Sequence, residues 1–132
     1  MNLFPPAEVA KNYIATGKGK VSTPVPKMFL LAVLAGVFIA MGGVGATTAA
    51  VSIPFPSVGK LVGACVFPGG LTMVLLAGSE LFTGNCLLTI PLLEREITVA
   101  GMAKNWAVVY LGNFAGSLLA AAGVVFSHQI SL

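Results

Sequence analysis

Apolar residues form three long stretches along the chain, and these stretches predict its architecture. The first extends from residue 28 to about 51, the second from 61 to 93, and the third from about 102 to 126. A helix needs roughly 20 mostly apolar residues to cross about 30 Å of hydrocarbon. Each stretch reaches this length, so the pattern predicts an all-α membrane protein with three transmembrane helices.

The polar positions divide the chain into two parts. Residues 1–27 carry four lysines and one glutamate and are predicted to form an N-terminal arm. Within this arm, two prolines precede a short amphipathic helix that is predicted from Ala7 to about Thr16, with Gly17 near its end. Residues 28–132 are predicted to form one three-span unit.

Composition supports the membrane assignment and excludes other classes. Hydrophobic residues make up 57% of the chain and charged residues 8%, whereas a soluble domain is roughly 25% charged. The mean hydropathy of +0.97 excludes intrinsic disorder, which needs low hydrophobicity and high charge. The net charge of +3 is too small and too dispersed for a nucleic-acid surface. The expected partner is therefore the lipid bilayer, with no nucleic acid.

The distribution of basic residues predicts an orientation in the membrane. Six of the seven Lys and Arg residues lie in the N-terminal arm or in residues 94–104, and only Lys60 lies between the first and second spans. Basic residues favour the cytoplasmic side of a membrane. We therefore expect the N-terminus in the cytoplasm and Leu132 on the opposite side.

The second stretch is too long for one straight helix, since residues 61–93 would extend over about 50 Å. Its middle, from Gly78 to Asn85, contains two glycines, a glutamate and three other polar residues. We expect a helix from about Leu61 to Ser79, a buried non-helical turn at residues 81–85, and a short helix toward Leu93. Such backbone is tolerated at membrane depth only inside protein or beside a water-filled cavity. The alternative is a surface loop before a short amphipathic helix.

Glu80 is a carboxylate within apolar sequence. A charge there is costly and is expected to face a protein interior or a cavity. Two interpretations stay open: the carboxylate accepts backbone N–H groups of the broken turn, or it belongs to a permeation path. Phe67, Leu71 and Phe82 prove nothing alone, because apolar residues on a membrane helix usually face lipid or a neighbouring helix.

Residues typical of catalysis or metal binding are scarce. Cys65 and Cys86 lie in apolar stretches and are expected to be reduced thiols that act as small apolar residues. A disulfide or a metal pair is the alternative. His128 has no cysteine or carboxylate near it in the sequence, so no metal site is expected. Because the chain lacks a phosphate-binding loop and a catalytic triad order, we expect no enzyme activity and no cofactor.

Several motifs resemble one known family. Residues 78–85, Gly-Ser-Glu-Leu-Phe-Thr-Gly-Asn, resemble the signature of the formate/nitrite transporter family of bacterial and archaeal anion channels. Residues 60–63 and 67–71 resemble the second helix of that family, and residues 104–106 and 110–113 resemble its third. The resemblance extends from the N-terminal arm to the end of the third span, with the motifs in the same order.

This resemblance implies a homopentamer of aquaporin-like protomers, each with its own pore for small monovalent anions such as formate, nitrite or hydrosulfide. It also implies a location in the inner (cell) membrane of a bacterium or archaeon. It assigns Phe82 and Leu71 to the apolar constrictions, with Phe67 beside them, and Thr83 to a hydroxyl in the pore. Lys20 corresponds to a basic residue near the cytoplasmic entrance. The residues implied for the broken-helix loop are Glu80, Gly84 and Asn85, with Glu80 holding the loop.

The family also implies a partner. Its members have six spans built as two inverted three-span repeats, and the motifs present here match the first repeat. The missing second repeat would carry the central pore histidine of the family, which His128 does not match. We therefore expect half of a channel protomer, as a truncation, a split gene product or a fragment of a nicked chain.

The mechanism implied by the resemblance is loss of hydration at Phe82 and Leu71, with polar help from Thr83 and the loop backbone. Transient protonation of the anion by the missing histidine would ease its passage through an apolar constriction. The sequence favours no single anion. The rival hypothesis is a non-transporting membrane-packing or assembly subunit.

Overall fold

The computed structural model describes residues 3–128, which form helices joined by short turns and contain no strand. Three helical segments are long and apolar enough to cross a membrane: Val25–Ala50, Pro56–Ala77 and Val99–Phe126. The predicted all-α fold with three candidate membrane spans is therefore confirmed. In chain order the elements are α1 (Pro6–Ser22), α2 (Val25–Ala50), α3 (Pro56–Val66), α4 (Pro68–Ala77), α5 (Phe82–Asn85), a 3₁₀ turn (Cys86–Leu88), α6 (Thr89–Leu93) and α7 (Val99–Phe126).

All three spans begin earlier than the apolar pattern predicted, and α7 starts at Val99 rather than near Met102. α2 starts at Val25 rather than Met28, and α3 starts at Pro56 rather than Leu61. A proline occupies the first turn of α2 and of α3, at Pro26 and Pro56. A proline in the first turn lacks an N–H that would have no helical partner anyway. The prolines that mark loops in the sequence therefore start helices here.

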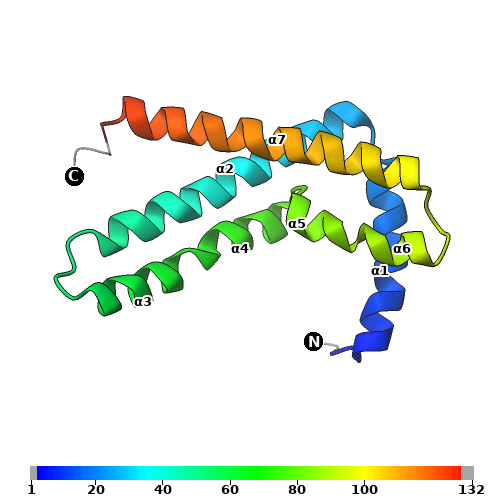
Figure 1. Cartoon of the computed structure of the whole chain (residues 1–132), viewed down its shortest axis with the longest axis horizontal. Coiled ribbons are helices and arrows are strands. Elements are labelled where there is room, and N and C mark those ends of the chain that lie inside the picture. Colours follow the sequence, from blue (N-terminus) through cyan, green and yellow to red (C-terminus); the bar gives the residue numbers. More distant parts are fainter. Residues whose placement is uncertain (1–2, 129–132) are drawn as a thin grey trace.

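Close packing between α2 and α7 forms the centre of the fold, where the two helices cross (Figure 1). Glycines make this contact. A Cβ added at Gly36 would overlap the backbone of Asn113, and one added at Gly116 would overlap the carbonyl of Val33. Small residues allow such close approach of helix backbones in lipid. The positions of α7 side chains are thereby fixed relative to α2.

The second apolar stretch is broken between α4 and α5. Gly78 adopts a left-handed conformation with φ of 62°, and residues 79–81 are not helical. The prediction that residues 81–85 are non-helical is therefore wrong, because the break lies at 78–81 and α5 already begins at Phe82. Positive φ carries little steric cost for glycine, which explains why the helix ends at Gly78. The N–H of Asn85 donates to the Leu81 carbonyl at 3.0 Å, so the chain is helical again through Gly84.

The N-terminal helix is longer than predicted. α1 continues through Gly17 and ends at Ser22 rather than near residue 16. Gly17 is buried, and a Cβ added there would lie 2.7 Å from Cγ of Pro91 in α6. This glycine is therefore a contact point with α6 rather than a helix stop.

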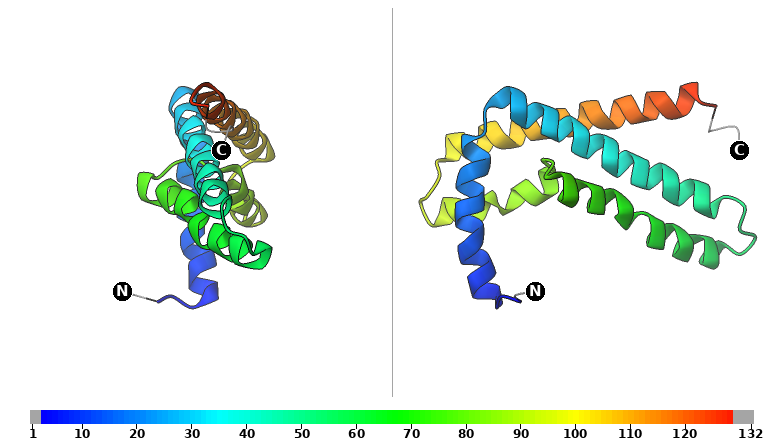
Figure 2. Two further views of the ribbon diagram at one scale, coloured as in Figure 1. Left: turned by 90° about the vertical axis from the view of Figure 1, so that its left-hand side faces the viewer. Right: turned by 180° about the vertical axis from the view of Figure 1, so that it is seen from behind.

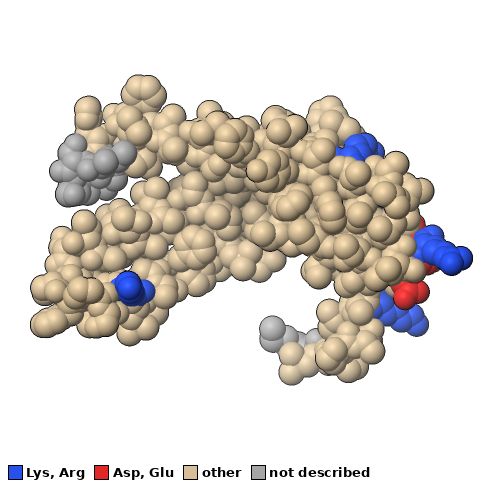
Figure 3. All heavy atoms as spheres, in the orientation of Figure 1, with Lys and Arg blue, Asp and Glu red and all other residues tan. Residues whose placement is uncertain are grey.

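The charged residues gather at one end of the molecule. α1 runs across the end of the bundle at which α6 and the start of α7 lie (Figure 2). Figure 3 shows most of the charged side chains at this end and one basic side chain at the other, where α3 lies (Figure 1), and α3 contains Lys60. The N-terminal arm and the segment at 94–98 therefore share one end, as the charge pattern suggested. Cys65 and Cys86 are separate, exposed free thiols.

Candidate functional site

Asn113 on α7 supplies hydrogen bonds to the broken segment. Its Oδ1 accepts the N–H of Phe82 at 2.9 Å, and its Nδ2 donates to the carbonyls of Glu80 at 2.9 Å and Ala32 at 2.8 Å. The N–H of Glu80 donates to the Leu31 carbonyl on α2 at 3.3 Å. An unpaired backbone group costs several kcal/mol in a bilayer core. One amide side chain thus joins α2, α7 and both sides of the break.

The carboxylate of Glu80 is buried and bound by two side chains. Its Oε1 accepts a charge-assisted hydrogen bond from Lys20 Nζ at 2.9 Å, and its Oε2 accepts one from Asn85 Nδ2 at 2.6 Å. The expectation that this carboxylate accepts nearby backbone N–H groups is therefore wrong. The turn N–H groups of Glu80 and Phe82 already donate elsewhere, to Leu31 and Asn113. The carboxylate is left to side chains from α1 and α5.

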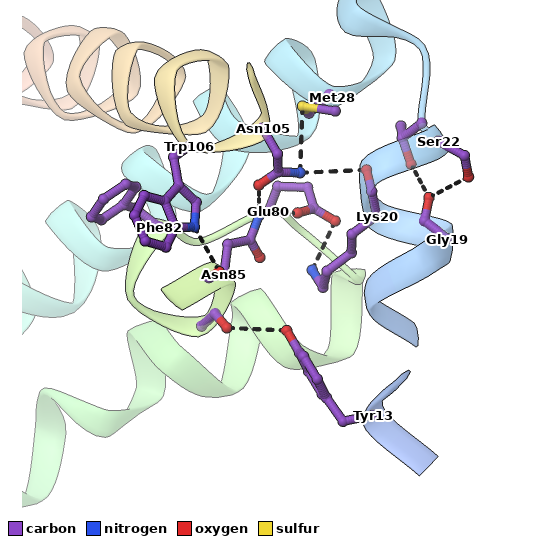
Figure 4. A network of polar contacts seen from close by, with 12 residues as sticks. Tyr13, Gly19, Lys20, Ser22, Met28, Glu80, Phe82, Asn85, Asn105 and Trp106 are labelled. Carbon is purple, nitrogen blue, oxygen red and sulfur yellow. Dashed lines mark hydrogen bonds and ion pairs between the residues drawn. The ribbon is translucent and has the colours of Figure 1, made fainter. Parts of the chain in front are cut away.

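A buried amide pair connects this ion pair to α7 (Figure 4). Asn85 Nδ2 also donates to Asn105 Oδ1 at 2.8 Å. Asn105 Nδ2 donates to the Lys20 carbonyl at 3.4 Å and contacts Met28 Sδ at 3.6 Å. Trp106 Nε1 donates to the Asn85 carbonyl at 2.9 Å. Because buried polar groups are costly when unpaired, this network fixes α5 between α1 and α7.

Tyr13 gives α1 a second contact with the broken segment. Its hydroxyl donates to the Gly84 carbonyl at 3.2 Å. Burial raises the pKa of Tyr13, and the Glu80 carboxylate and Cys86 add to this effect. The phenol therefore stays protonated and keeps its role as a hydrogen-bond donor.

Phe82 lies between the core and an open groove. One part of its side chain packs against the buried cluster of Met28, Ala32 and Val109. Its ring makes edge-to-face contacts with Trp106, at a centroid distance of 6.0 Å, and with Tyr110, at 5.6 Å. The groove has a volume of about 330 Å³. Its lining residues come from α2, the break, α5 and α7, and they are Gly36, Ile39, Ala40, Leu81, Phe82, Tyr110, Asn113, Phe114 and Ser117.

Comparison with known proteins identifies the family. The family model described as formate/nitrite transporter matches residues 7–132, which include the broken segment and its α7 partners. The chain belongs to the formate/nitrite transporter family. The resemblance inferred from the sequence motifs is therefore confirmed.

The regions of similarity include nearly all of this chain but less than half of the length of each relative. The uncharacterized transporter YrhG of Bacillus subtilis is 38% identical over 130 residues, which are 96% of this chain and 48% of the relative. The formate channel FocA of Escherichia coli is 39% identical over 121 residues, 89% of this chain and 42% of the relative. The probable formate transporter of Methanothermobacter thermautotrophicus is 37% identical over 121 residues, 88% and 44% respectively.

The site residues that the family resemblance implied fall into two groups. Lys20, Glu80 and Asn85 are brought together in one hydrogen-bonded cluster. Phe67, at the junction of α3 and α4, and Leu71, one turn into α4, are 46% and 45% exposed and do not line the groove at Phe82.

Thr83 and Gly84 also differ from expectation. Both residues are exposed, although the sequence predicted that the whole 81–85 segment is buried. Leu81 and Phe82 are half-buried and only Asn85 is fully enclosed. The short helix turns one side toward α7, and Thr83 and Gly84 lie on its other side.

The site also contains residues for which the sequence analysis gave no role. Asn113 hydrogen-bonds the backbone of the break and Asn105 accepts a hydrogen bond from Asn85, while Trp106 and Tyr110 contact Phe82. A signal for the two asparagines was available. Each places an amide within an apolar span, where a polar side chain is costly unless it bonds to another group.

Proposed function

We propose that this chain supplies half of a membrane channel for small monovalent anions, of which formate, nitrite and hydrosulfide are the candidates. The observation that carries the proposal is the family match over residues 7–132, which includes the broken helix. Relatives from a bacterium and an archaeon, named as a formate channel and a probable formate transporter, support it.

The proposed pathway passes the ring of Phe82, with Leu71 and Phe67 contributing to its apolar constrictions. An anion loses part of its hydration shell at such a constriction, so a polar group nearby lowers the barrier. We assign this role to the hydroxyl of Thr83, which directly follows Phe82. The half-buried position of Phe82 beside a groove and the exposure of Thr83 are compatible with this arrangement.

Lys20 is proposed to lie at the cytoplasmic entrance, with Glu80, Gly84 and Asn85 holding the loop. The ammonium of Lys20 is 2.9 Å from the Glu80 carboxylate, so the pair is nearly neutral when viewed from a distance. Coulomb attraction of an anion to Lys20 is therefore effective only at short range, where the two charges are resolved.

The proposed assembly is a homopentamer in the cell membrane of a bacterium or archaeon, with the N-terminus in the cytoplasm. Each pore would also require a second three-helix repeat as partner. Support for that partner comes from the relatives, of which this chain covers 48% and 42%. Six of seven Lys and Arg residues on one end of the molecule support the orientation.

The proposal is tested by anion flux into liposomes that contain the complete assembled channel, with formate, nitrite and hydrosulfide measured separately. Phe82→Ala should raise the flux or relax selectivity, and Thr83→Val should reduce the flux, because it keeps the shape but removes the hydroxyl. The matched control is Phe55→Ala, an exposed aromatic in the turn before α3, which should behave as the unmodified protein.

Size-exclusion chromatography of each variant separates pathway effects from assembly effects. Unchanged flux and selectivity for both variants, in intact assemblies, would remove Phe82 and Thr83 from the pathway. Assemblies that conduct none of the three anions would instead favour the non-transporting packing subunit.

A further inference from the structure

The ring of Phe82 is held by aromatic neighbours on one face of α7. Trp106 and Tyr110 are four residues apart, so they project from the same side of the helix. Their rings meet the Phe82 ring at interplanar angles of 64° and 76°. Edge-to-face contacts of this kind are favoured by the ring quadrupoles and are sensitive to orientation. The pair therefore restrains both the position and the tilt of the Phe82 ring.

The backbone of Phe82 is fixed to the same helix. Its N–H donates to Asn113 Oδ1 at 2.9 Å, and Asn113 lies seven residues after Trp106, again on the same side of α7. Trp106 is in turn held by its own N–H bond to the Asn85 carbonyl at 2.9 Å. With the backbone of Phe82 anchored, its ring can move only by side-chain rotation, and Trp106 and Tyr110 occupy the space on the α7 side.

The Phe82 side chain is only half-buried, and it borders a groove. Phe82 and Tyr110 both line the groove of about 330 Å³ between α2 and α7. An anion in this groove would meet the Phe82 ring beside the Tyr110 ring that contacts it. The support on α7 therefore decides how far the ring projects into the open space.

We propose that Trp106 and Tyr110 are positioning residues for the Phe82 ring and that they set, through this ring, the size of anion that the channel passes. The inference rests on the proposed function, in which Phe82 faces the anion pathway. It goes further by naming residues that determine selectivity indirectly, through their contacts with the Phe82 ring.

Tyr110 separates this role from ordinary packing. Within this chain the residue is 60% exposed, so truncating it removes little surface that the chain itself buries, yet its ring lies 5.6 Å from that of Phe82. A packing role predicts at most a change in stability. A positioning role predicts a change in the ratio of anion permeabilities while the assembly remains intact.

The experiment measures the permeability of acetate relative to formate in liposomes that contain the complete assembled channel. Tyr110→Leu should raise this ratio about two- to tenfold, the factor that corresponds to the loss of one aromatic pair. Tyr110→Phe keeps the ring and should retain the original ratio. Phe126→Leu is the matched control, because Phe126 is an exposed aromatic residue on the same helix that does not line this groove; it should leave the ratio unchanged.

A second background identifies the route of the effect. In a Phe82→Ala channel, Tyr110→Leu should cause no further change, since the ring that it positions is gone. An equal change in both backgrounds would overturn the inference, because Tyr110 would then act on the anion directly. If Phe82→Ala alone alters the ratio but Tyr110→Leu alone leaves it unchanged, the inference is also overturned.

An unchanged ratio for Phe82→Ala itself would be a different failure. It would remove Phe82 from the pathway and overturn the proposed pathway together with this inference. If Tyr110→Leu prevents assembly, as judged by size-exclusion chromatography, Tyr110→Met fills more of the space without an aromatic edge. The ratio of acetate to formate permeability for Tyr110→Met, measured with Phe82 intact and with Phe82→Ala, then tests the inference.

Discussion

The apolar stretch is interrupted twice: at the junction of α3 and α4, where Pro68 follows Phe67 and which we call the kink, and at the break at Gly78–Leu81. The structure accommodates the two interruptions in different ways. At the kink the backbone keeps a helical conformation, with Phe67 at φ −51° and ψ −41°. The N–H of Phe67 donates to Gly63 at 2.9 Å, and the N–H of Gly70 donates to Phe67 at 3.0 Å. At the break, by contrast, the chain leaves the helix, and several backbone groups take partners from α2 and α7.

The surroundings of the two interruptions differ accordingly. Glycines bring α2 against the kink: a Cβ added at Gly42 would lie 2.9 Å from the Phe67 carbonyl, and one added at Gly70 would lie 2.8 Å from the Phe38 carbonyl. Polar side chains surround the break instead. A membrane helix tolerates a proline kink by local adjustment, whereas non-helical residues require hydrogen-bonding groups from other helices.

The largest effect is expected when the buried charge at the break loses its partner. Lys20→Met leaves the Glu80 carboxylate, which is 8% exposed, without its cation. Removing one member of a buried ion pair costs about 3 kcal/mol or more. We expect a fall of this size in the free energy of unfolding, measured by reversible unfolding in mixed detergent micelles.

Two further variants test the cause of that loss. Lys18→Met removes a lysine from the same helix, but its pair with Glu96 is exposed, at 54% and 44%. It should therefore cost less than about 1 kcal/mol. Adding Glu80→Gln to Lys20→Met should recover part of the stability, because no unpaired charge remains. Equal losses for the two lysine variants would show that burial of the charge is not the cause.

The next effect concerns the amide that satisfies the break. Asn113→Leu keeps a similar shape but leaves the Phe82 N–H and the Glu80 carbonyl without their partner. Each stranded group costs about 1–3 kcal/mol. The amide hydrogen of Phe82 should also exchange faster.

The control at the kink is Thr72→Val, which removes a hydroxyl that donates to the Pro68 carbonyl at 3.0 Å. We expect little change in the free energy of unfolding, because this carbonyl belongs to a helix. A similar loss of stability for Asn113→Leu and Thr72→Val would contradict the comparison.

A smaller effect is expected where α2 meets α7. Gly36→Ala would force the backbone of Asn113 away from α2, because the added Cβ overlaps it. Overpacking of this kind costs about 1–3 kcal/mol. Gly43→Ala on the same helix is the control, since an added Cβ meets nothing within 4 Å there. Thermal unfolding in detergent should separate the two variants, and equal melting temperatures would argue against close packing at Gly36.

The smallest effects distinguish the two interruptions directly. Gly78→Ala places an alanine at a φ of 62° in open space, so only the backbone conformation resists it, by about 1 kcal/mol. Pro68→Ala at the kink should change the free energy of unfolding by less, because the helical bonds on both sides are already formed. The same unfolding assay compares them, and a greater loss for Pro68→Ala would reverse the order.

The sequence predicted the three spans because 57% hydrophobic and 8% charged residues leave no other architecture. It predicted that the second span is broken but not where. Gly78 and Gly84 both lie in the polar interruption. The helix breaks at the glycine whose neighbouring backbone groups can form hydrogen bonds with Asn113 on α7. Composition and local pattern carry no information about that choice.

The partners of the Glu80 carboxylate likewise could not be predicted from the local sequence. Lys20 lies 60 residues from Glu80 in the sequence, and only the docking of α1 brings them together. The same docking explains Gly17, which the pattern marked as a helix end and which is a contact with Pro91. The pathway roles of Phe67, Leu71, Phe82 and Thr83 stay predictions.

The dependence of the break on Asn113 has a consequence for biogenesis. A ribosome synthesises residues 78–85 well before Asn113, so the broken segment emerges without the side chain that satisfies it. Until α7 is inserted, the Phe82 N–H and the Glu80 carbonyl lack their partner, and lipid supplies none. The first two spans can therefore enter the bilayer in order, but the segment between α4 and α5 reaches its final conformation only when the third arrives. Insertion of α7 is thus the step that completes the membrane-embedded fold of this chain.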